Sequence, residues 1–225
     1  MPNSLHQNNA QGRGTVTRFP VADDTEEDSK RNQIHRISAR LFAQHGYEAV
    51  GVPELCNATG LGRGAFYYHA DSKDSILFEI SKGYMDLLIA EAQAILDQGL
   101  RADTTIERLS AAFVRMSISD QDEMIVCFRE HHLLGAANQK TLQKQYADYQ
   151  AIWESAVVTG VEQGLFRPVH SIELRAILGM YFNSFLWPET KKSMPADTVA
   201  GYLSRLILDA IRLVEHAPAR VGARA

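Results

Sequence analysis

Hydrogen-bonding and cationic side chains gather in one short segment of this 225-residue chain, between Gly62 and Lys73. Those able to bind a phosphate or the edge of a base are Arg63, Tyr67, Tyr68, His69 and Lys73. Between them lie the small residues Gly62, Gly64 and Ala65. A helix with this surface is poor core material, but it suits the major groove of DNA, where base edges present donors and acceptors. We take these residues as the candidate DNA-binding set and expect Lys73 to be exposed.

Local signals on either side predict the helices that hold this segment. Pro53 suits the first turn of a helix, where its missing N–H is not needed. Gly60 readily adopts the left-handed conformation of a helix end, so a turn is expected there. Phe66 is the expected inward anchor of the next helix, and Ser72 is the expected cap of the one after it. Residues 50–77 therefore predict a helix-turn-helix followed by a connecting helix.

A first helix is expected to brace this motif from about residue 28 to residue 45. Its apolar residues share one face: Ile34, Ile37, Leu41 and Phe42. Four cations lie elsewhere on the same helix, and a merely solvated face is the alternative interpretation for them. We add one of the four, Arg40, to the candidate DNA contacts.

The sequences LFAQHGYEAV at 41–50 and FYYHADSKDSI at 66–76 resemble those of the TetR-type transcriptional regulators, whose signature reads LYYHFxSKEEL. The resemblance covers about residues 29–77. Gly51 and Gly62 stand where that family usually has hydroxyl side chains that cap helices, so weaker caps are expected here. The resemblance implies an all-α, nine-helix fold with an N-terminal three-helix DNA-binding domain and a C-terminal helical domain for ligand binding and dimerisation.

Charge and composition agree with a folded DNA-binding protein of modest nonspecific affinity. The net charge is −4, but residues 28–75 carry six Lys or Arg against five Asp or Glu, so the motif region is the least acidic part. It is not a basic patch, which favours dependence on two half-sites bound together. The sequence shows no run of about eighteen uncharged apolar residues and no apolar signal core, so we expect a cytoplasmic protein without a membrane partner.

The sequence gives no support for an enzyme, a metal site or a cofactor. Gly60, Gly62 and Gly64 are not a phosphate loop, because no strand precedes them and no Lys-Ser/Thr pair follows. The eight histidines include no HExxH motif. Cys56 and Cys127 form no CxxC pair and are expected to be buried apolar side chains in a reducing compartment. We therefore expect no catalytic residue.

Beyond the motif the chain is expected to be wholly helical. Breaks rich in Gly, Pro, Ser and Asp separate six further helices, near 73–98, 104–118, 122–134, 138–163, 171–187 and 196–215. With the three helices before them, these give an all-α fold of nine helices. The expected domains are a disordered tail at 1–27, a DNA-binding domain at 28–75, a ligand-binding and dimerisation domain at 76–217, and a disordered tail at 218–225.

The second domain is expected to hold a small molecule, because several of its helices are rich in aromatic residues and methionine, which line apolar pockets. The candidate ligand contacts are Phe113, Met116, Met124, Phe128, Arg129, Tyr149, Trp153, Met180, Asn183 and Trp187, and Tyr146 and Phe182 share their character. Arg129 is expected to meet a carboxylate or phosphate of the ligand. Plain core packing is the alternative interpretation for each residue.

A looser resemblance concerns the same domain. The sequences FREHHLLG, GVEQGLFRP and AILGMYFNSFLWP are similar to those of TetR-type regulators that respond to acyl-CoA thioesters. These shared pieces are short. Trp187 falls where that branch often has a tryptophan near the ligand, but Leu186 stands where an arginine commonly precedes it. The resemblance implies a small apolar or acyl-CoA-like effector.

Apolar stripes near the C-terminus predict a dimer interface. The candidate interface residues are Ile177, Tyr181, Phe185, Leu203, Leu206, Ile207, Ala210, Ile211 and Val214. The resemblance implies that two such helices from each subunit form a four-helix interface. Packing within one chain is the alternative interpretation.

Together these observations predict a dimeric, ligand-responsive transcriptional regulator that binds a palindromic operator in double-stranded DNA. The resemblance implies a repressor, released when a small-molecule effector favours a state in which the two recognition helices no longer match successive major grooves. An all-helical small-molecule-binding protein or enzyme that does not bind DNA is the alternative.

Overall fold

The computed structural model describes residues 26–186 and 194–213, and within these ranges every regular element is a helix. The first three helices are α1 (Glu26–His45), α2 (Val52–Thr59) and α3 (Arg63–His69), and the rest are α4 (Lys73–Leu96), α5 (Ala102–Ser119), α6 (Gln121–Glu130), α7 (Ala136–Glu162), α8 (Ser171–Phe182) and α10 (Ala196–Ile211). Two 3-10 turns, η1 (His131–Leu133) and η2 (Ser184–Leu186), follow α6 and α8. The predicted all-α fold class is confirmed.

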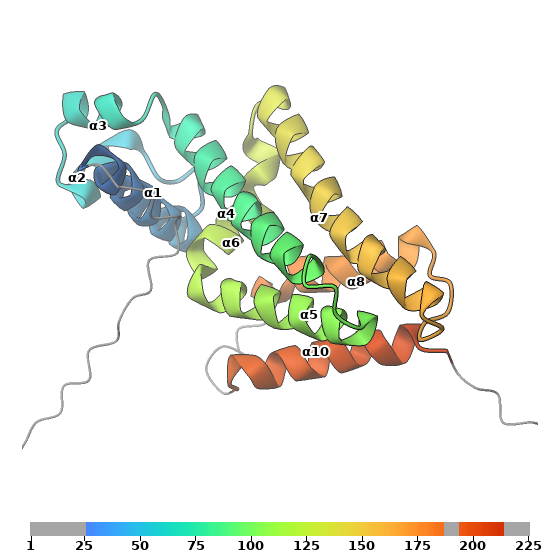
Figure 1. The fold of residues 1–225 in the computed structure, drawn as a ribbon. Coiled ribbons are helices and arrows are strands. Elements are labelled where there is room, and N and C mark those ends of the chain that lie inside the picture. The colour runs from blue at the N-terminus through green and yellow to red at the C-terminus, as the bar shows by residue number, and fades with distance from the viewer. Residues whose placement is uncertain (1–25, 187–193, 214–225) are drawn as a thin grey trace, which may run out of the picture.

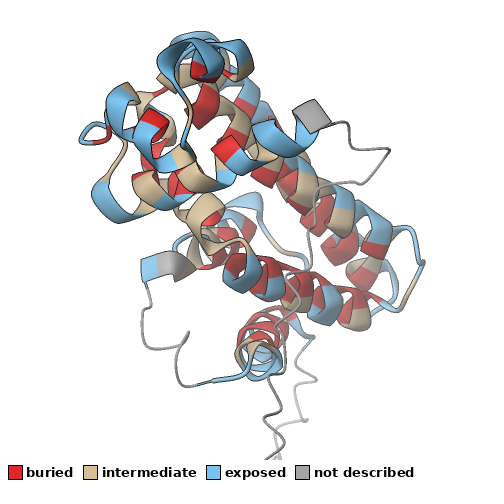
Figure 2. Cartoon of the chain, turned by 90° about the vertical axis from the view of Figure 1, so that its left-hand side faces the viewer, coloured by how far each residue is buried: buried red, intermediate tan, exposed pale blue. Residues whose placement is uncertain are grey.

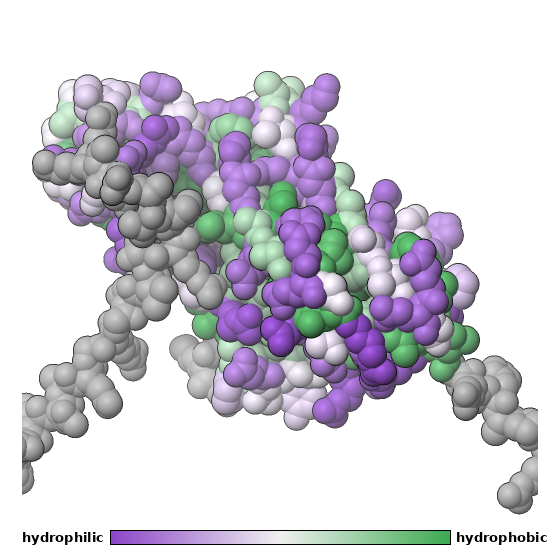
Figure 3. Space-filling view, in the orientation of Figure 1, coloured by the Kyte–Doolittle hydropathy of each residue, from purple (hydrophilic) through white to green (hydrophobic). Residues whose placement is uncertain are grey.

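The helices form a small head and a larger body (Figure 1). The head consists of α1, α2 and α3, and the body consists of the helices from α5 onward. The 24-residue helix α4 runs from the head through the body, and residues from its first turns to its last are buried, from Ile76 to Ile95. In Figure 2 exposed residues cover the outer side of the head, whereas buried residues line the inner faces of the body helices. Figure 3 shows small hydrophobic patches among hydrophilic residues on one face of the body.

Local sequence signals explain where several helices begin and end. The Ser72 side chain accepts a hydrogen bond from the backbone N–H of Ser75, and the Ser75 hydroxyl accepts one from Ser72 N–H, so both residues cap the start of α4. Gly51 and Gly62 precede α2 and α3 with extended backbones, and neither helix has a side-chain cap. The weaker capping expected at these two glycines is therefore confirmed.

Some predicted boundaries were wrong. Helix α1 begins at Glu26, so the last two residues of the predicted tail are helical; acidic residues at a helix start are favoured by its dipole. The helix predicted at 122–134 ends at Glu130 and continues as a 3-10 turn. The one predicted at 171–187 ends at Phe182. The tail predictions for residues 1–25 and 218–225 fall outside the described residues.

Ionic contacts hold the first half of α1 against α4. The guanidinium of Arg31 donates two hydrogen bonds to the Glu79 carboxylate, at 2.6 and 3.1 Å. His35 Nε2 lies 2.9 Å from Oε2 of the same carboxylate. Both contacts are partly exposed, so each contributes modestly to stability. They fix one end of the head to the connecting helix.

Replacing Glu79 by glutamine is expected to reduce the acid sensitivity of folding. The hydrogen bond from His35, and then the one from Arg31, lower the pKa of Glu79 from 4.5 to about 2. Because the folded-state pKa is the lower one, the carboxylate stabilises the fold above about pH 4.5 and loses this effect as the pH falls toward 2. The Tm of Glu79→Gln should lie below the wild-type Tm at pH 6 and approach it near pH 2.5. A deficit of equal size at both pH values would contradict this expectation, and Glu107→Gln, at an exposed site on α5, is the control.

Candidate nucleic-acid interface

The turn between α2 and α3 is built around Gly60. This residue has φ of 71° and ψ of 16°, the left-handed conformation that glycine adopts without steric cost. Its N–H donates to Asn57 O, and the N–H of Leu61 donates to Cys56 O at 3.0 Å. These bonds satisfy the last carbonyls of α2 and redirect the chain into α3. The predicted helix-turn-helix is therefore present.

Helix α3 presents one side chain to the core and the rest to the surface. Phe66 is fully buried, as predicted, whereas Tyr67 is 45% and Tyr68 73% exposed. Arg63, Gly64 and Ala65 are exposed as well, and His69 is half-buried. A helix anchored by one ring, with two tyrosines and an arginine in solvent, presents its polar groups to a ligand outside the protein. The structure thus brings the predicted α3 residues onto one accessible helix.

The start of α3 is open to close approach by another molecule. Apart from adjacent residues and the backbone of the same helix, no atom lies within 4 Å of the place where a side-chain carbon would be at Gly62 or at Gly64. The first turn of a helix has backbone N–H groups without helical partners, and these groups favour anions. A phosphate of a nucleic acid could therefore reach the backbone here. Arg40, the candidate contact on α1, is also exposed.

Lys73 does not lie free beside the groove, so that expectation was wrong. Its ammonium donates to the carbonyl oxygens of Tyr47 and Val50, at 2.8 and 3.0 Å, and lies 4.0 Å from the centre of the Tyr47 ring. Burial lowers the pKa of Lys73. The turn between α1 and α2 contains carbonyl groups without helical partners, and the ammonium satisfies two of them. Lys73 therefore joins this turn to the start of α4.

Replacing Lys73 by methionine is expected to lower DNA affinity without changing its dependence on salt. Log affinity falls as log salt concentration rises, and each lysine on a phosphate makes this slope steeper by about 0.9, because it releases counterions. Lys73 uses its charge inside the protein, so its loss should disturb the turn and leave this slope unchanged. Arg40→Met, at an exposed cation, should lower the slope by about 1 per subunit. Titrations at several salt concentrations measure both, and a Lys73→Met slope matching that of Arg40→Met would contradict the prediction.

The aromatic residues of the body pack against one another. Phe113, Met116, Met124, Tyr149 and Trp153 are all buried. Phe182 lies at the centre of the cluster: its ring stacks on Phe128 with 4.8 Å between centroids and lies about 6 Å from Phe113, Tyr146 and Tyr149. The sequence indicated that Phe182 belongs to this set but gave no sign of its central position. The cluster joins α5, α6, α7 and α8.

Arg129 is not directed at a ligand, so the sequence-based role was wrong. Its two terminal nitrogens donate to the carbonyl oxygens of Phe42 and Ala43, at 2.6 and 3.1 Å, and its Nε donates to Glu130. Ala43 O is among the last carbonyls of α1, which lack helical partners, whereas Phe42 O also accepts a hydrogen bond from Gly46 N–H. A planar guanidinium can bind both oxygens at once. The charge of Arg129 is therefore used between α6 of the body and α1 of the head.

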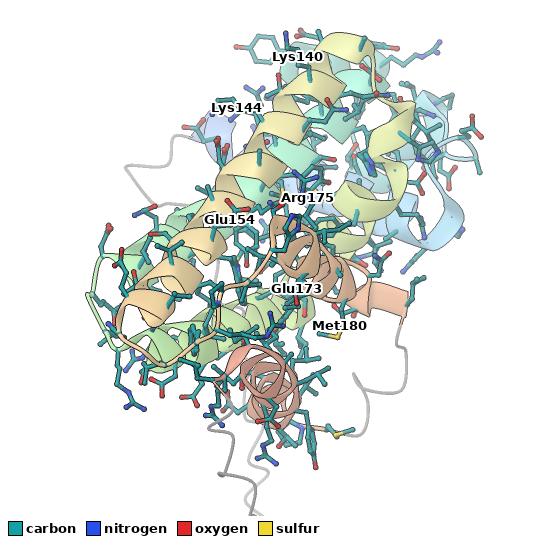
Figure 4. The ribbon with its side chains drawn as sticks, turned by 90° about the vertical axis from the view of Figure 1, so that its right-hand side faces the viewer. Lys140, Lys144, Glu154, Glu173, Arg175 and Met180 are labelled. Carbon is teal, nitrogen blue, oxygen red and sulfur yellow. The ribbon has the colours of Figure 1, made fainter. Side chains whose placement is uncertain are left out.

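The other candidate ligand residues differ in their surroundings. Asn183 is exposed, and its side chain donates to the carbonyl of Gly179 at 2.8 Å, so it caps α8 and its predicted ligand contact is not supported. Met180 is half-buried near the end of α8 (Figure 4). Trp187 lies outside the described residues.

Several residues predicted at a dimer interface are core residues of one subunit. Tyr181 is fully buried among rings of α5 and α7, and its hydroxyl donates to Ser110 Oγ at 2.7 Å. Leu203, Ile207 and Ile211 are also buried, on the face of α10 that packs on α5. The predictions for these four residues were wrong, because an apolar stripe on a helix does not indicate which chain covers it.

The rest of the predicted interface is accessible or undescribed. Leu206 is 56% exposed and Ala210 is exposed, both on the outer face of α10. Tyr202, which the sequence did not single out, lies on the same face and is 60% exposed. Ile177 on α8 is half-buried. Nothing is described of the Phe185 side chain or of Val214.

Residues 26–186 and 194–213 contain neither a membrane-spanning helix nor a cluster of possible metal ligands. No helix there is long and apolar enough to cross a membrane. Among the same residues, no three His, Cys, Asp or Glu side chains are grouped as metal ligands would be. Both cysteines are free and buried.

The head carries a helix-turn-helix whose second helix, α3, is exposed, and a larger helical body supports it. This arrangement is that of a DNA-binding regulator. Two family models match the chain: "Bacterial regulatory proteins, tetR family" over residues 36–80, and "Tetracyclin repressor-like, C-terminal domain" over residues 100–211. The chain belongs to the tetR family of bacterial regulatory proteins. It is a transcriptional regulator rather than an enzyme.

Named relatives agree with this assignment. The HTH-type transcriptional repressor KstR2 of Rhodococcus jostii is 29% identical over 196 residues, which are 85% of this chain and 96% of that protein. Among solved structures, the TetR family regulator PfmR of Thermus thermophilus has a TM-score of 0.74 and 29% identity, over 79% of this chain and 97% of PfmR. AibR in complex with isovaleryl coenzyme A and operator DNA has a TM-score of 0.71 and 21% identity, over 79% and 97% of the two chains.

Proposed function

We propose that the chain acts as a homodimeric repressor in the cytoplasm, binding a palindromic operator and leaving it when a small effector binds in the body. The observation that carries the proposal is the accessibility of α3, where Phe66 is buried while Tyr67 and Tyr68 are exposed. The curated relative KstR2 is a repressor by name. One copy of a seven-residue helix with little surrounding basic charge reads few bases, so two half-sites supply the specificity.

The proposed DNA contacts are the exposed residues of α3, the half-buried His69 at its end, Gly62 just before it and one residue of α1. They are Arg40, Gly62, Arg63, Gly64, Ala65, Tyr67, Tyr68 and His69. Lys73 is left out, because its ammonium binds carbonyls of the turn between α1 and α2. The proposed DNA-binding domain begins with α1 at residue 26 and ends at residue 75, and the proposed effector and dimerisation domain is residues 76–217.

The proposed dimer surface is the outer face of α10, with Tyr202, Leu206 and Ala210. Two large apolar side chains on this face are more than half exposed, which is typical of a surface that another protein covers. The same helix buries its other face on α5 within the subunit. A second copy of the chain is the proposed partner, since two recognition helices must be presented together.

The proposed effector is a small apolar molecule or an acyl-CoA thioester that enters near the aromatic cluster around Phe182. Rings and thioether side chains accept apolar groups of varied shape. AibR, which shares the fold, was crystallised with isovaleryl coenzyme A. Arg129 is left out of the proposed ligand contacts, because three of its N–H donors bind α1 and Glu130.

A selection experiment tests the proposed function. The purified chain is mixed with a pool of random duplexes about three helical turns long, and bound duplexes are enriched and sequenced. We expect an inverted repeat whose half-sites are centred about one helical turn apart, together with sedimentation of the free protein as a dimer. Arg63→Ala and Tyr67→Ala should lose the enriched duplex, whereas Lys140→Ala, on the outer surface of α7 (Figure 4), should retain it.

Failure to enrich any duplex, or enrichment unaffected by both α3 substitutions, would reject the proposal. Native mass spectrometry of the purified protein gives the mass of any molecule that stays bound in the body. A co-purified thioester or other apolar compound should release the selected duplex when added back, and a compound that binds the body without changing DNA affinity would contradict the proposed release.

A further inference from the structure

Helix α6 contacts both parts of the molecule through neighbouring residues. Phe128 stacks on Phe182 at 4.8 Å and meets the Tyr84 ring edge-on at 5.9 Å, so it belongs to the aromatic cluster of the body. The next residue, Arg129, binds the end of α1 in the head. In Figure 1 α6 lies between α1 and the long helices of the body. A displacement of α6 would therefore change both the Phe128–Phe182 contact and the contact of Arg129 with α1.

The Arg129 contact lies at the end of α1, just before the chain turns toward the DNA-binding motif. Phe42 O accepts a hydrogen bond from Arg129 and another from the N–H of Gly46, at 2.9 Å. Gly46 has φ of 86° and starts the turn that leads to α2. A cation is favoured at this negative end of the α1 dipole. The guanidinium of Arg129 thus holds the end of α1 in place just before the helix-turn-helix.

Helix α1 is attached to two different helices at its two ends. Arg31 and His35 bind Glu79 on α4, whereas the Phe42 and Ala43 carbonyls bind Arg129 on α6. If α6 moves relative to α4, these attachments cannot both keep their geometry unless α1 turns. Shifts of about 1 to 2 Å between packed helices are common in switching proteins. Parting the Phe128 and Phe182 rings to admit a molecule would produce such a shift.

We propose that Arg129 is the positioning residue that couples the aromatic cluster of the body to the helix-turn-helix, through its hydrogen bonds to the end of α1. This inference rests on the proposed function, because it requires a head that binds DNA. Arginine is suited to the task because its fork spans two carbonyls and a carboxylate together. A lysine would reach one of these groups at a time.

Reciprocity allows a test that needs no knowledge of the effector. If the body biases the head, then DNA bound to the head must bias the body by the same free energy. Amide hydrogen exchange of residues 121–133, which cover α6 and η1, is measured with and without a duplex selected by the wild-type protein. We expect the duplex to slow exchange in α6 by about fivefold or more, the lower end of ordinary coupling.

Three variants distinguish coupling from a merely structural role. Arg129→Met and Arg129→Lys should still bind the duplex at saturating concentration, but the change in α6 exchange should fall below about twofold. Arg108→Met, at an exposed arginine on α5, should keep the wild-type change. A residue that only stabilises the fold would alter exchange equally in the free and bound states, so the difference would persist. The lysine variant keeps the charge and serves if the methionine variant fails to fold.

The outcomes separate the two proposals. If the wild-type chain binds no duplex, the proposed function fails and this inference fails with it. If the duplex binds but α6 exchange in the wild type does not change, or changes to the same degree in the Arg129 variants, the coupling role of Arg129 is wrong while the proposed function remains.

Discussion

Replacing Phe66 by alanine is expected to destabilise the protein by about 3 to 5 kcal/mol, the usual result of removing a buried phenylalanine ring. Phe66 is fully buried and is the one buried side chain of α3. The cavity that remains would lie beneath the recognition helix. DNA binding should be lost as a consequence of the lost fold of the head.

Tyr68→Ala is the matched control, and its expected effects are the reverse. This residue lies two positions further along the same helix and is 73% exposed. Its removal should leave Tm within about 2 °C of wild type, because surface substitutions usually change stability by less than about 0.5 kcal/mol. DNA affinity should fall by about 1 to 3 kcal/mol per subunit if the ring contacts bases. Thermal denaturation and gel shifts measure the two quantities, and a large Tm loss in Tyr68→Ala would mean that α3 is not oriented as described.

Replacing Gly160 by alanine is expected to be the most disruptive small change in the body. A Cβ at this position would lie 2.8 Å from Phe166 Cγ, and other atoms of the same ring are nearer still. The Phe166 ring is buried, and the backbone N–H groups of Leu165 and Phe166 both donate to the Gly160 carbonyl. These bonds hold Phe166 close to Gly160, so its ring cannot easily move away. Overpacking of this kind costs about 1 to 3 kcal/mol or more.

Gly179→Ala in α8 is the control for Gly160→Ala. Apart from adjacent residues and the backbone of α8 itself, no atom lies within 4 Å of the added carbon there. Alanine should therefore be neutral or stabilise by up to about 1 kcal/mol, as expected of an open helical site. Denaturant titration of both variants measures the difference. Equal stability of the two proteins would show that Phe166 can move aside, and that the close contact is not a constraint on the fold.

The head could be predicted closely because its signals are local. Gly60 and Ser72 determine their own turn and cap through backbone conformation and hydrogen bonds within a few residues. Phe66 is the one large apolar residue without a hydroxyl on a short polar helix, so its burial follows from its type. These features depend on the adjacent sequence and hardly on the rest of the fold.

The roles of Lys73 and Arg129 could not be predicted because their partners are distant in sequence. Lys73 binds carbonyls 23 and 26 residues earlier, and Arg129 binds carbonyls 86 and 87 residues earlier. Backbone carbonyls carry no side-chain identity, so no residue type announces them. A cation in the sequence predicts only that an oxygen will be found, and here the oxygens belong to the protein.

The apolar residues of α8 and α10 show a second limit of sequence reasoning. Tyr181, Ile207 and Leu206 have similar character, yet the first two are core residues and the third is exposed. Leu206 and Ile207 are neighbours on α10, so their burial depends on which face of that helix packs on α5. That choice is a property of the assembled body and cannot be read from residue type alone.

The uninterrupted course of α4 sets the mechanical scale of any response. A 24-residue helix is about 36 Å long, so a tilt of about 5° at its body end would carry its other end through roughly 3 Å. The major groove is about 12 Å wide. A displacement of roughly 3 Å in each of two subunits would move both recognition helices out of register with the duplex. An effector could therefore act with very little rearrangement of the side chains around it, and the angle of α4 relative to the body would report its binding.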